Sequence, residues 1–120
     1  MKPTEHQLEI FFKVAKLSVD IESEVHTFFE IIKQTHPKLP REFIDSISRD
    51  FGTEYLLREA KALYQEQFST EELDQLIQFW SSGVGRKLVS GEFRGKQQTL
   101  IERWSNDAKH LCLAENEKYV

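Results

Sequence analysis

Residues 68–73 read Phe-Ser-Thr-Glu-Glu-Leu and are the most informative stretch of the chain. Ser69 followed three residues later by Glu72 is the pattern of a capping box, in which each side chain accepts a hydrogen bond from the other residue's backbone amide. Glu71 and Glu72 also place negative charge in the first helical turn, where it favours the helix dipole. The pattern predicts a helix that begins at Ser69, after the aromatic Phe68, and buries Leu73.

A second helix start follows in the stretch Phe-Trp-Ser-Ser-Gly-Val-Gly-Arg-Lys at residues 79–87. Ser82 is a good cap for the next helix, and Gly85 lets a neighbouring backbone or aromatic ring approach closely. Lys87 can lay its stem along apolar surface and keep its charge in water. We expect Trp80 to be largely buried between the two helices. Since each residue has a structural role, we interpret this stretch as specifying the fold rather than a reaction.

The whole chain shows the three- and four-residue apolar spacing of helices, with glycine and proline mostly at the joints. Thr4 followed by Gln7 resembles a capping box that opens the first helix. The expected helices span about 4–16, 19–35, 40–51, 54–67, 69–81 and 84–115, and Gly91 and Gly95 predict a kink or split near 90–95 in the last one. We also expect Gly52 to end the third helix and Thr53 to cap the fourth.

These helices predict an all-α fold, a compact single-domain bundle of five to six helices with short connections. The domain is expected to cover residues 1–120, with its core in about 4–113 and a frayed tail at 115–120. The residues predicted to face inward include Leu8, Phe11, Phe12 and Ala15 in the first helix, Phe28 and Phe29 in the second, Phe43, Ile44, Ile47 and Phe51 in the third, and Leu100, Trp104 and Leu111 in the last.

Composition excludes some classes of function. With 39% apolar and 30% charged residues and a net charge of −4, the 120-residue chain is typical of a globular protein without general attraction to nucleic acid or anionic membranes. Residues 86–103 form a mildly basic patch, which we interpret as a solvated helix face, with an anionic partner surface as the alternative. The single Cys112 cannot form an internal disulfide and is expected to be a buried or partly exposed bystander.

Localisation stays open between two compartments. No apolar run approaches the roughly 20 residues of a membrane span, and residues 1–6 lead straight into a charged amphipathic helix. We therefore expect a cytoplasmic protein if Met1 is the native start, and a periplasmic one if a signal peptide has been removed.

The order of residues in 60–90 resembles a bacterial helical family known as domain of unknown function 2059. The family pattern is an aromatic residue, a Phe-[Ser/Thr]-x-Glu-Glu-[Leu/Ile] cap and then Phe-Tyr-x-Ser-Pro-x-Gly-x-Lys, with Trp80 here in place of Tyr and Gly83 in place of Pro. The resemblance extends more weakly to residues 39–43, and residues 91–96 depart from the family's usual run around a proline. It implies an exported, all-helical protein, and it supplies no catalytic residues.

No arrangement of residues points clearly to chemistry, so we expect no catalytic residue, metal or cofactor. Glu22, His26 and Glu30 share a helix face that could hold zinc with a ligand from elsewhere, but a solvated surface row explains them better. Glu71 and Glu72 point about 100° apart on a helix and do not converge on one substrate.

The sequence therefore favours a non-enzymatic helical domain that acts through protein contacts, as a homodimer or with another protein. Apolar residues expected to point outward could form the contact surface; they are Ile10, Val14, Leu57 and Val89. The alternative is a carrier or sensor of a small apolar ligand, bound in a cavity between helices; its expected lining residues are Phe28, Phe29, Leu63, Phe79, Trp80 and Lys87. An enzyme of unknown type is the third hypothesis.

Overall fold

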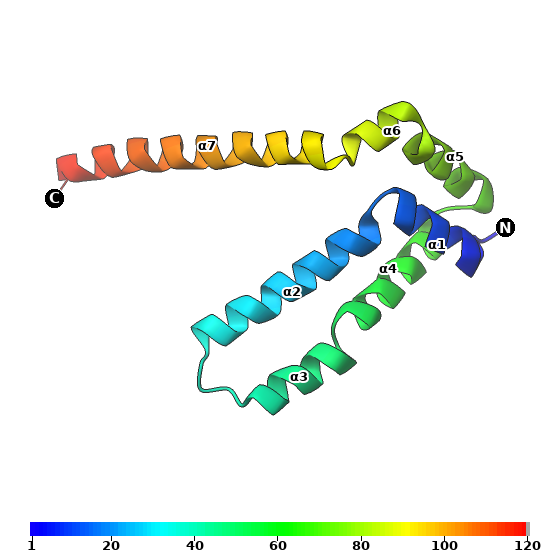
Figure 1. Cartoon of the computed structure of the whole chain (residues 1–120), viewed down its shortest axis with the longest axis horizontal. Coiled ribbons are helices and arrows are strands. Elements are labelled where there is room, and N and C mark those ends of the chain that lie inside the picture. Colours follow the sequence, from blue (N-terminus) through cyan, green and yellow to red (C-terminus); the bar gives the residue numbers. More distant parts are fainter. Residues whose placement is uncertain (120) are drawn as a thin grey trace. The chain divides into compact units, whose positions relative to one another are not determined.

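The computed structural model describes residues 1–119 and contains helices but no strand over that range (Figure 1). The helices are α1 (Glu5–Val14), α2 (Leu17–Thr35), α3 (Arg41–Asp50), α4 (Thr53–Gln67), α5 (Thr70–Ser81), α6 (Gly83–Leu88) and α7 (Gly91–Asn116), followed by the 3-10 turn η1 (Glu117–Tyr119). The all-α class predicted from the sequence is confirmed.

The chain divides into two compact units, which we describe separately. The first covers Met1–Gly85 and holds α1 to α5, whereas the second begins at Arg86 and holds α7. The single domain over residues 1–120 stays a prediction, and the contacts within the structure group the chain into these two units.

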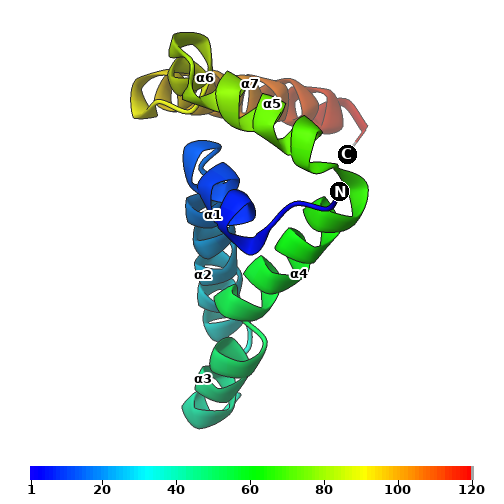
Figure 2. The same ribbon diagram turned by 90° about the vertical axis from the view of Figure 1, so that its right-hand side faces the viewer.

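The core of the first unit forms around α1, which packs against α2, α4 and α5 (Figure 2). The buried cluster consists of Leu8, Phe11, Phe12 and Ala15 of α1 and Leu73 of α5. Tyr64 of α4 packs against this cluster, with its ring centroid 5.1 Å from that of Phe11 and 5.4 Å from that of Phe12. The apolar spacing of α1 thus correctly predicted which of its side chains are buried.

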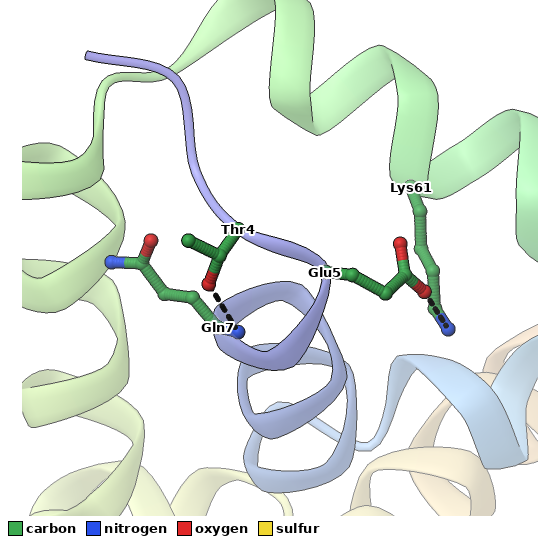
Figure 3. Close-up of polar contacts among 4 residues, drawn as sticks. All are labelled: Thr4, Glu5, Gln7 and Lys61. Carbon is green, nitrogen blue, oxygen red and sulfur yellow. Dashed lines mark hydrogen bonds and ion pairs between the residues drawn. The ribbon is translucent and has the colours of Figure 1, made fainter.

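The start of α1 is tied to both neighbouring helices (Figure 3). Thr4 Oγ1 accepts a hydrogen bond from the backbone nitrogen of Gln7 at 3.1 Å, which confirms Thr4 as the cap. The Gln7 side chain does not return to Thr4 and reaches α5 instead, where Nε2 donates to the Thr70 carbonyl oxygen at 2.8 Å and to Asp74 Oδ1 at 2.7 Å. On the other side of α1, Glu5 pairs with Lys61 of α4 at 3.3 Å.

The far end of the first unit is an open arm, in which α2 packs beside α3 and α4 (Figure 1). Phe28, Phe43, Ile47 and Phe51 are exposed there, so their predicted burial is wrong, and Ile44 is the buried exception. The arm is a thin layer in which α3 packs mainly against α2 and α4, so one face of each helix stays in water. Helical spacing predicts an apolar face, but not whether another helix covers it.

Two joints of the first unit differ from the sequence-based expectation. Helix α1 ends at Val14 and α2 begins at Leu17, with Lys16 between them in the left-handed conformation at a φ of 61°. Gly52 is the residue before the first turn of α4, and Thr53 already lies inside the helix rather than capping it. Both joints are thus one or two residues from the expected positions, within the usual uncertainty of helix ends.

The second unit consists mainly of α7, which Ser90 caps by accepting a hydrogen bond from the Phe93 backbone nitrogen at 3.2 Å. The predicted split near 90–95 is confirmed and falls just before Gly91, because the serine cap starts a new helix there. The helix continues to Asn116 and η1 to Tyr119, so the tail expected to fray is helical as far as the structure describes it. The last residue of that predicted tail, Val120, lies outside the described residues.

Candidate functional site

The capping box predicted at the start of α5 forms with both of its hydrogen bonds. Ser69 Oγ accepts from the Glu72 backbone nitrogen at 3.1 Å, and Glu72 Oε1 accepts from the Ser69 backbone nitrogen at 3.0 Å. Leu73 follows directly and is completely buried in the core cluster. The side chains of Ser69 and Glu72 therefore have a structural role in the cap, while Glu71 stays exposed in the first turn.

Replacing Ser69 with alanine should lower the free energy of unfolding by about 1 kcal/mol, because the first turn of α5 loses one of its capping acceptors. Urea unfolding followed by circular dichroism measures this change. The same substitution at Ser23, an exposed position inside α2, is the control and should have little effect. Equal stability of the two variants would mean that the cap contributes nothing.

Gly85 belongs to the stretch at residues 79–87, and it is buried in the first part of α6. Its backbone nitrogen donates to Ser82 Oγ at 3.2 Å, so Ser82 acts as the expected cap. A Cβ atom added to Gly85 would lie 2.6 Å from Trp80 Cα and would also clash with the Phe79 carbonyl oxygen. The close approach predicted from the sequence is therefore an approach of backbone to backbone, which leaves no space for a side chain.

We expect Gly85→Ala to destabilise the protein by about 1–3 kcal/mol, since the backbone of α5 or α6 has to move to admit the methyl group. Gly83→Ala, two residues away, is the matched control, because nothing lies within 4 Å of its added Cβ atom. Thermal unfolding of both variants tests the difference. A Gly85→Ala variant as stable as Gly83→Ala would contradict the close packing.

The residues proposed from the sequence as a ligand site are spread over several elements. Phe28 and Phe29 lie together on α2, with ring centroids 5.2 Å apart at an angle of 83°. Leu63 of α4 and Phe79 of α5 are exposed, and Trp80 is half-buried against the core cluster rather than largely buried. Lys87 is exposed and belongs to the second unit.

Phe28 and Phe29 line an apolar groove of about 440 Å³ in the arm of the first unit. The other lining residues come from α2, α3, α4 and the joint before α4; they are Glu24, Val25, Ile47, Phe51, Gly52, Tyr55 and Leu56. The rings of Phe51 and Tyr55 stack at 4.2 Å and form one wall. Of the six residues expected to bind a ligand, this groove contains two, and their role in binding stays a prediction.

Among the described residues, no three histidine, cysteine, aspartate or glutamate side chains lie close enough together to hold a metal ion. Glu22, His26 and Glu30 border a shallow surface pocket on α2, as expected from their spacing. Glu30 is paired with Lys33, whose Nζ lies 3.4 Å from Glu30 Oε1. The row is therefore better explained as a solvated helix face with a local ion pair.

The four residues predicted to point outward differ in their exposure. Ile10 is exposed, Val14 and Leu57 are half-buried, and Val89 is buried, so the prediction for Val89 is wrong. Leu57 packs against the core cluster, since α4 turns that side chain towards α1. This set does not form the expected contact surface.

Another exposed apolar surface lies on α7, where the sequence predicts a buried face. Trp104 is 68% exposed and Leu111 is 73% exposed, although both were predicted to be buried. Leu100 and Ile101 are exposed on the same side of the helix. Among the described residues of its own unit, α7 has only the end of α6 and η1 beside it in the chain, so no other long helix of that unit covers this stripe. The periodicity identified the stripe correctly but assigned it to an intramolecular core. Cys112 is also exposed on α7.

Comparison with protein-family models finds a similarity that covers part of the chain. Residues 54–102 match the family described as "Uncharacterized protein conserved in bacteria (DUF2059)", which confirms the resemblance seen in the sequence over α4, α5, α6 and the first part of α7. No curated protein and no solved structure matches the chain. None of the helices in residues 1–119 combines the length and the apolarity needed to cross a membrane.

Proposed function

We propose that this protein is a non-enzymatic helical module that acts through protein contacts, by self-association. The observation that carries the proposal is the uncovered apolar stripe of α7, with Trp104 and Leu111 about two-thirds or more exposed. Contiguous exposed apolar surface of this kind marks interaction sites, and tryptophan is the residue type most often found at the energetic centre of an interface. A helix of 26 residues spans about 39 Å and can present a long contact line.

Light scattering over a range of protein concentrations tests this proposal, and two leucine substitutions sharpen it. Leu111→Ala, on the stripe, should weaken self-association at least about tenfold, because an exposed side chain loses its burial in both copies. Leu113→Ala, two residues away on the opposite side of the helix and 51% exposed, should leave it unchanged. A protein that stays monomeric at high micromolar concentration would contradict the proposal.

The groove of the first unit favours a second candidate function, the binding of a small apolar ligand. Its volume of about 440 Å³ lies in the range of ligand sites, and most of its lining side chains are aliphatic or aromatic. A fluorescent fatty acid is a suitable probe. Phe28→Ser removes one groove residue that is 56% exposed, whereas Phe43→Ser removes a residue of α3 that is 53% exposed and outside the groove lining. Binding should weaken only in the first variant, and equal binding by both would exclude this site.

A further inference from the structure

The apolar stripe of α7 follows an unusual spacing. Its apolar residues are Phe93, Leu100, Trp104, Ala108 and Leu111, with the polar Gln97 in line with them and Ile101 at one margin. The successive steps are 4, 3, 4, 4 and 3 residues, and the pattern repeats after 11, as between Phe93 and Trp104 and between Leu100 and Leu111. A period of 11 corresponds to about 3.67 residues per turn, so the stripe stays on one side of a nearly straight α-helix. Two such helices can touch along their length without strong supercoiling.

The side chains of α7 are arranged so that the helix complements itself when reversed. The point between Ser105 and Asn106 is the centre of this arrangement. Reversing the helix about it puts Leu100 opposite Leu111, and it puts the large Trp104 beside the small Ala108. The middle of the stripe therefore offers leucine to leucine and a bulky side chain to a small one, which is the shape match that close packing requires.

The charged residues beside the stripe also meet opposite charges when a second copy of the helix is placed antiparallel to the first. Arg103 and Asp107 lie on one flank of the stripe, and reversal brings each next to the other in the second copy. Lys96 becomes level with Glu115, which lies within the line of the stripe at its other end. In the structure Lys96 pairs with Glu92 at 3.6 Å and Glu115 pairs with Lys118 of η1 at 3.0 Å, and all four side chains are exposed. Exposed pairs of this kind contribute little and can be exchanged for contacts with a partner.

We infer that α7 pairs in antiparallel fashion with α7 of a second copy, across a two-fold axis between Ser105 and Asn106. This inference rests on the proposed self-association and names its surface and direction. Parallel pairing in register would set each residue in the middle of the stripe against itself. Trp104 would meet Trp104 and Ala108 would meet Ala108, so that one level is overfilled and the next leaves a gap. A two-fold contact also closes on itself, so it produces a dimer and not a filament.

Charge opposes the parallel arrangement as well. Glu115 lies within the line of the stripe, so a parallel pair would place it beside Glu115 of the second copy, and like charges at that separation repel. Arg103 and Asp107 would both face the other flank of the second helix, where neither finds the opposite charge that the antiparallel pair supplies.

The area that a stable interface has to bury determines how much of α7 takes part in the contact. A specific interface buries about 1,200 Å² or more in total, while one exposed aromatic side chain supplies on the order of 150 Å². Trp104 and its immediate neighbours are therefore not enough, and the pairing has to run along the stripe from Phe93 to Leu111. In the antiparallel register the segment 100–111 faces the same segment of the second copy, and Phe93 and Gln97 extend the contact towards residues 114–118 of that copy.

Cys112, the single cysteine, provides a direct test of direction. In the antiparallel pair the two Cys112 residues are separated by about 20 Å along the axis, since each lies between six and seven residues from the centre. In a parallel pair they are level with each other. A bifunctional maleimide whose spacer is well below that separation should therefore leave the unsubstituted protein without a covalent dimer. In the Gln98→Cys variant it should link the introduced thiol of one copy to Cys112 of the other, because these positions are level to within one residue and on the same flank.

Thr99→Cys is the matched control. It is level with Cys112 of the second copy, but it lies on the opposite side of the helix, directed away from the partner, and should give no covalent dimer. All three positions are exposed on α7. Selective linking of the Gln98→Cys variant supports the inference. A dimer by light scattering in which the unsubstituted Cys112 links readily, or in which the two variants link equally, overturns the antiparallel register and leaves the proposed self-association standing. A monomer at every concentration overturns both.

Discussion

Replacing Phe12 with alanine is expected to lower the free energy of unfolding by about 3–5 kcal/mol. Phe12 is completely buried in the core cluster, and its ring packs edge-on against those of Phe11 at 5.9 Å and Tyr64 at 5.4 Å. Alanine removes the ring and leaves a cavity that the surrounding helices can fill only in part. Since a domain of this size has a total stability of about 5–15 kcal/mol, the loss is a large fraction of the whole. The midpoint of urea unfolding measures it.

Phe43→Ala is the control, because it makes the same chemical change at a side chain that is 53% exposed on α3. It should cost less than about 1 kcal/mol, as most of its ring is already in water. The contrast between the two variants tests whether stability is concentrated around α1. If the two substitutions cost the same, the open arm contributes more than its exposure indicates and the description of the core is wrong.

The burial of α1 could be predicted from the sequence because its apolar face has helices on several sides. Leu8 and Phe12 lie on the apolar face of α1, and they are buried because α2, α4 and α5 surround that face. Phe28 and Trp104 also lie on apolar stripes, but both are exposed. The spacing shows that each belongs to an apolar stripe, but burial depends on whether a second surface covers the stripe, and spacing carries no information about that.

The joints were harder to predict where the local signal is weak. Ser69 and Ser82 cap the helices that follow them, and both positions were predicted correctly because a serine side chain before a helical pattern is a clear start signal. Lys16 turns the chain between α1 and α2 with a φ of 61°, a conformation that usually calls for glycine or asparagine. A lysine there gives no sign of a turn, and the joint expected between about 16 and 19 lies about two residues later than the observed one.

At Gln7 the sequence predicts the helix cap correctly but not the contacts of the side chain. The Thr4–Gln7 spacing suggested a capping box, in which the Gln7 side chain would return to Thr4. In the structure its amide points the other way and bridges α1 to α5 through two acceptors, the Thr70 carbonyl and the Asp74 carboxylate. No pattern within one helix reveals this role, because both partners lie more than 60 residues away along the chain.

The bridge gives the second prediction with a large effect, that Gln7→Glu destabilises the protein by about 3–5 kcal/mol at neutral pH. Gln7 is buried, and its Nε2 donates both of its protons to oxygen acceptors. A carboxylate in its place has no proton to donate, so it would face the Thr70 carbonyl oxygen and the Asp74 carboxylate without a partner. Desolvation and the neighbouring negative charge both disfavour the ionised form of the introduced side chain.

The pH dependence identifies the charge as the cause. The pKa of a glutamate in the unfolded chain is about 4.3. In the folded state the pKa of the introduced glutamate should be higher, because burial and the nearby Asp74 carboxylate disfavour its charged form. The loss of stability is then complete at a pH above both values and shrinks as the pH falls, because protonation removes the charge and restores a donor. Urea unfolding of the variant and the original protein at neutral pH and at about pH 4 measures this change.

Two further variants separate the charge from the change in shape. Gln75→Glu adds the same charge at an exposed position of α5 and should have little effect at either pH. Adding Asp74→Asn to Gln7→Glu should recover part of the loss, because the asparagine amide can donate to the new carboxylate where the aspartate could only repel it. A penalty that is the same at both pH values, and that Asp74→Asn does not reduce, would mean that the buried bridge between α1 and α5 does not hold these helices together as the structure describes.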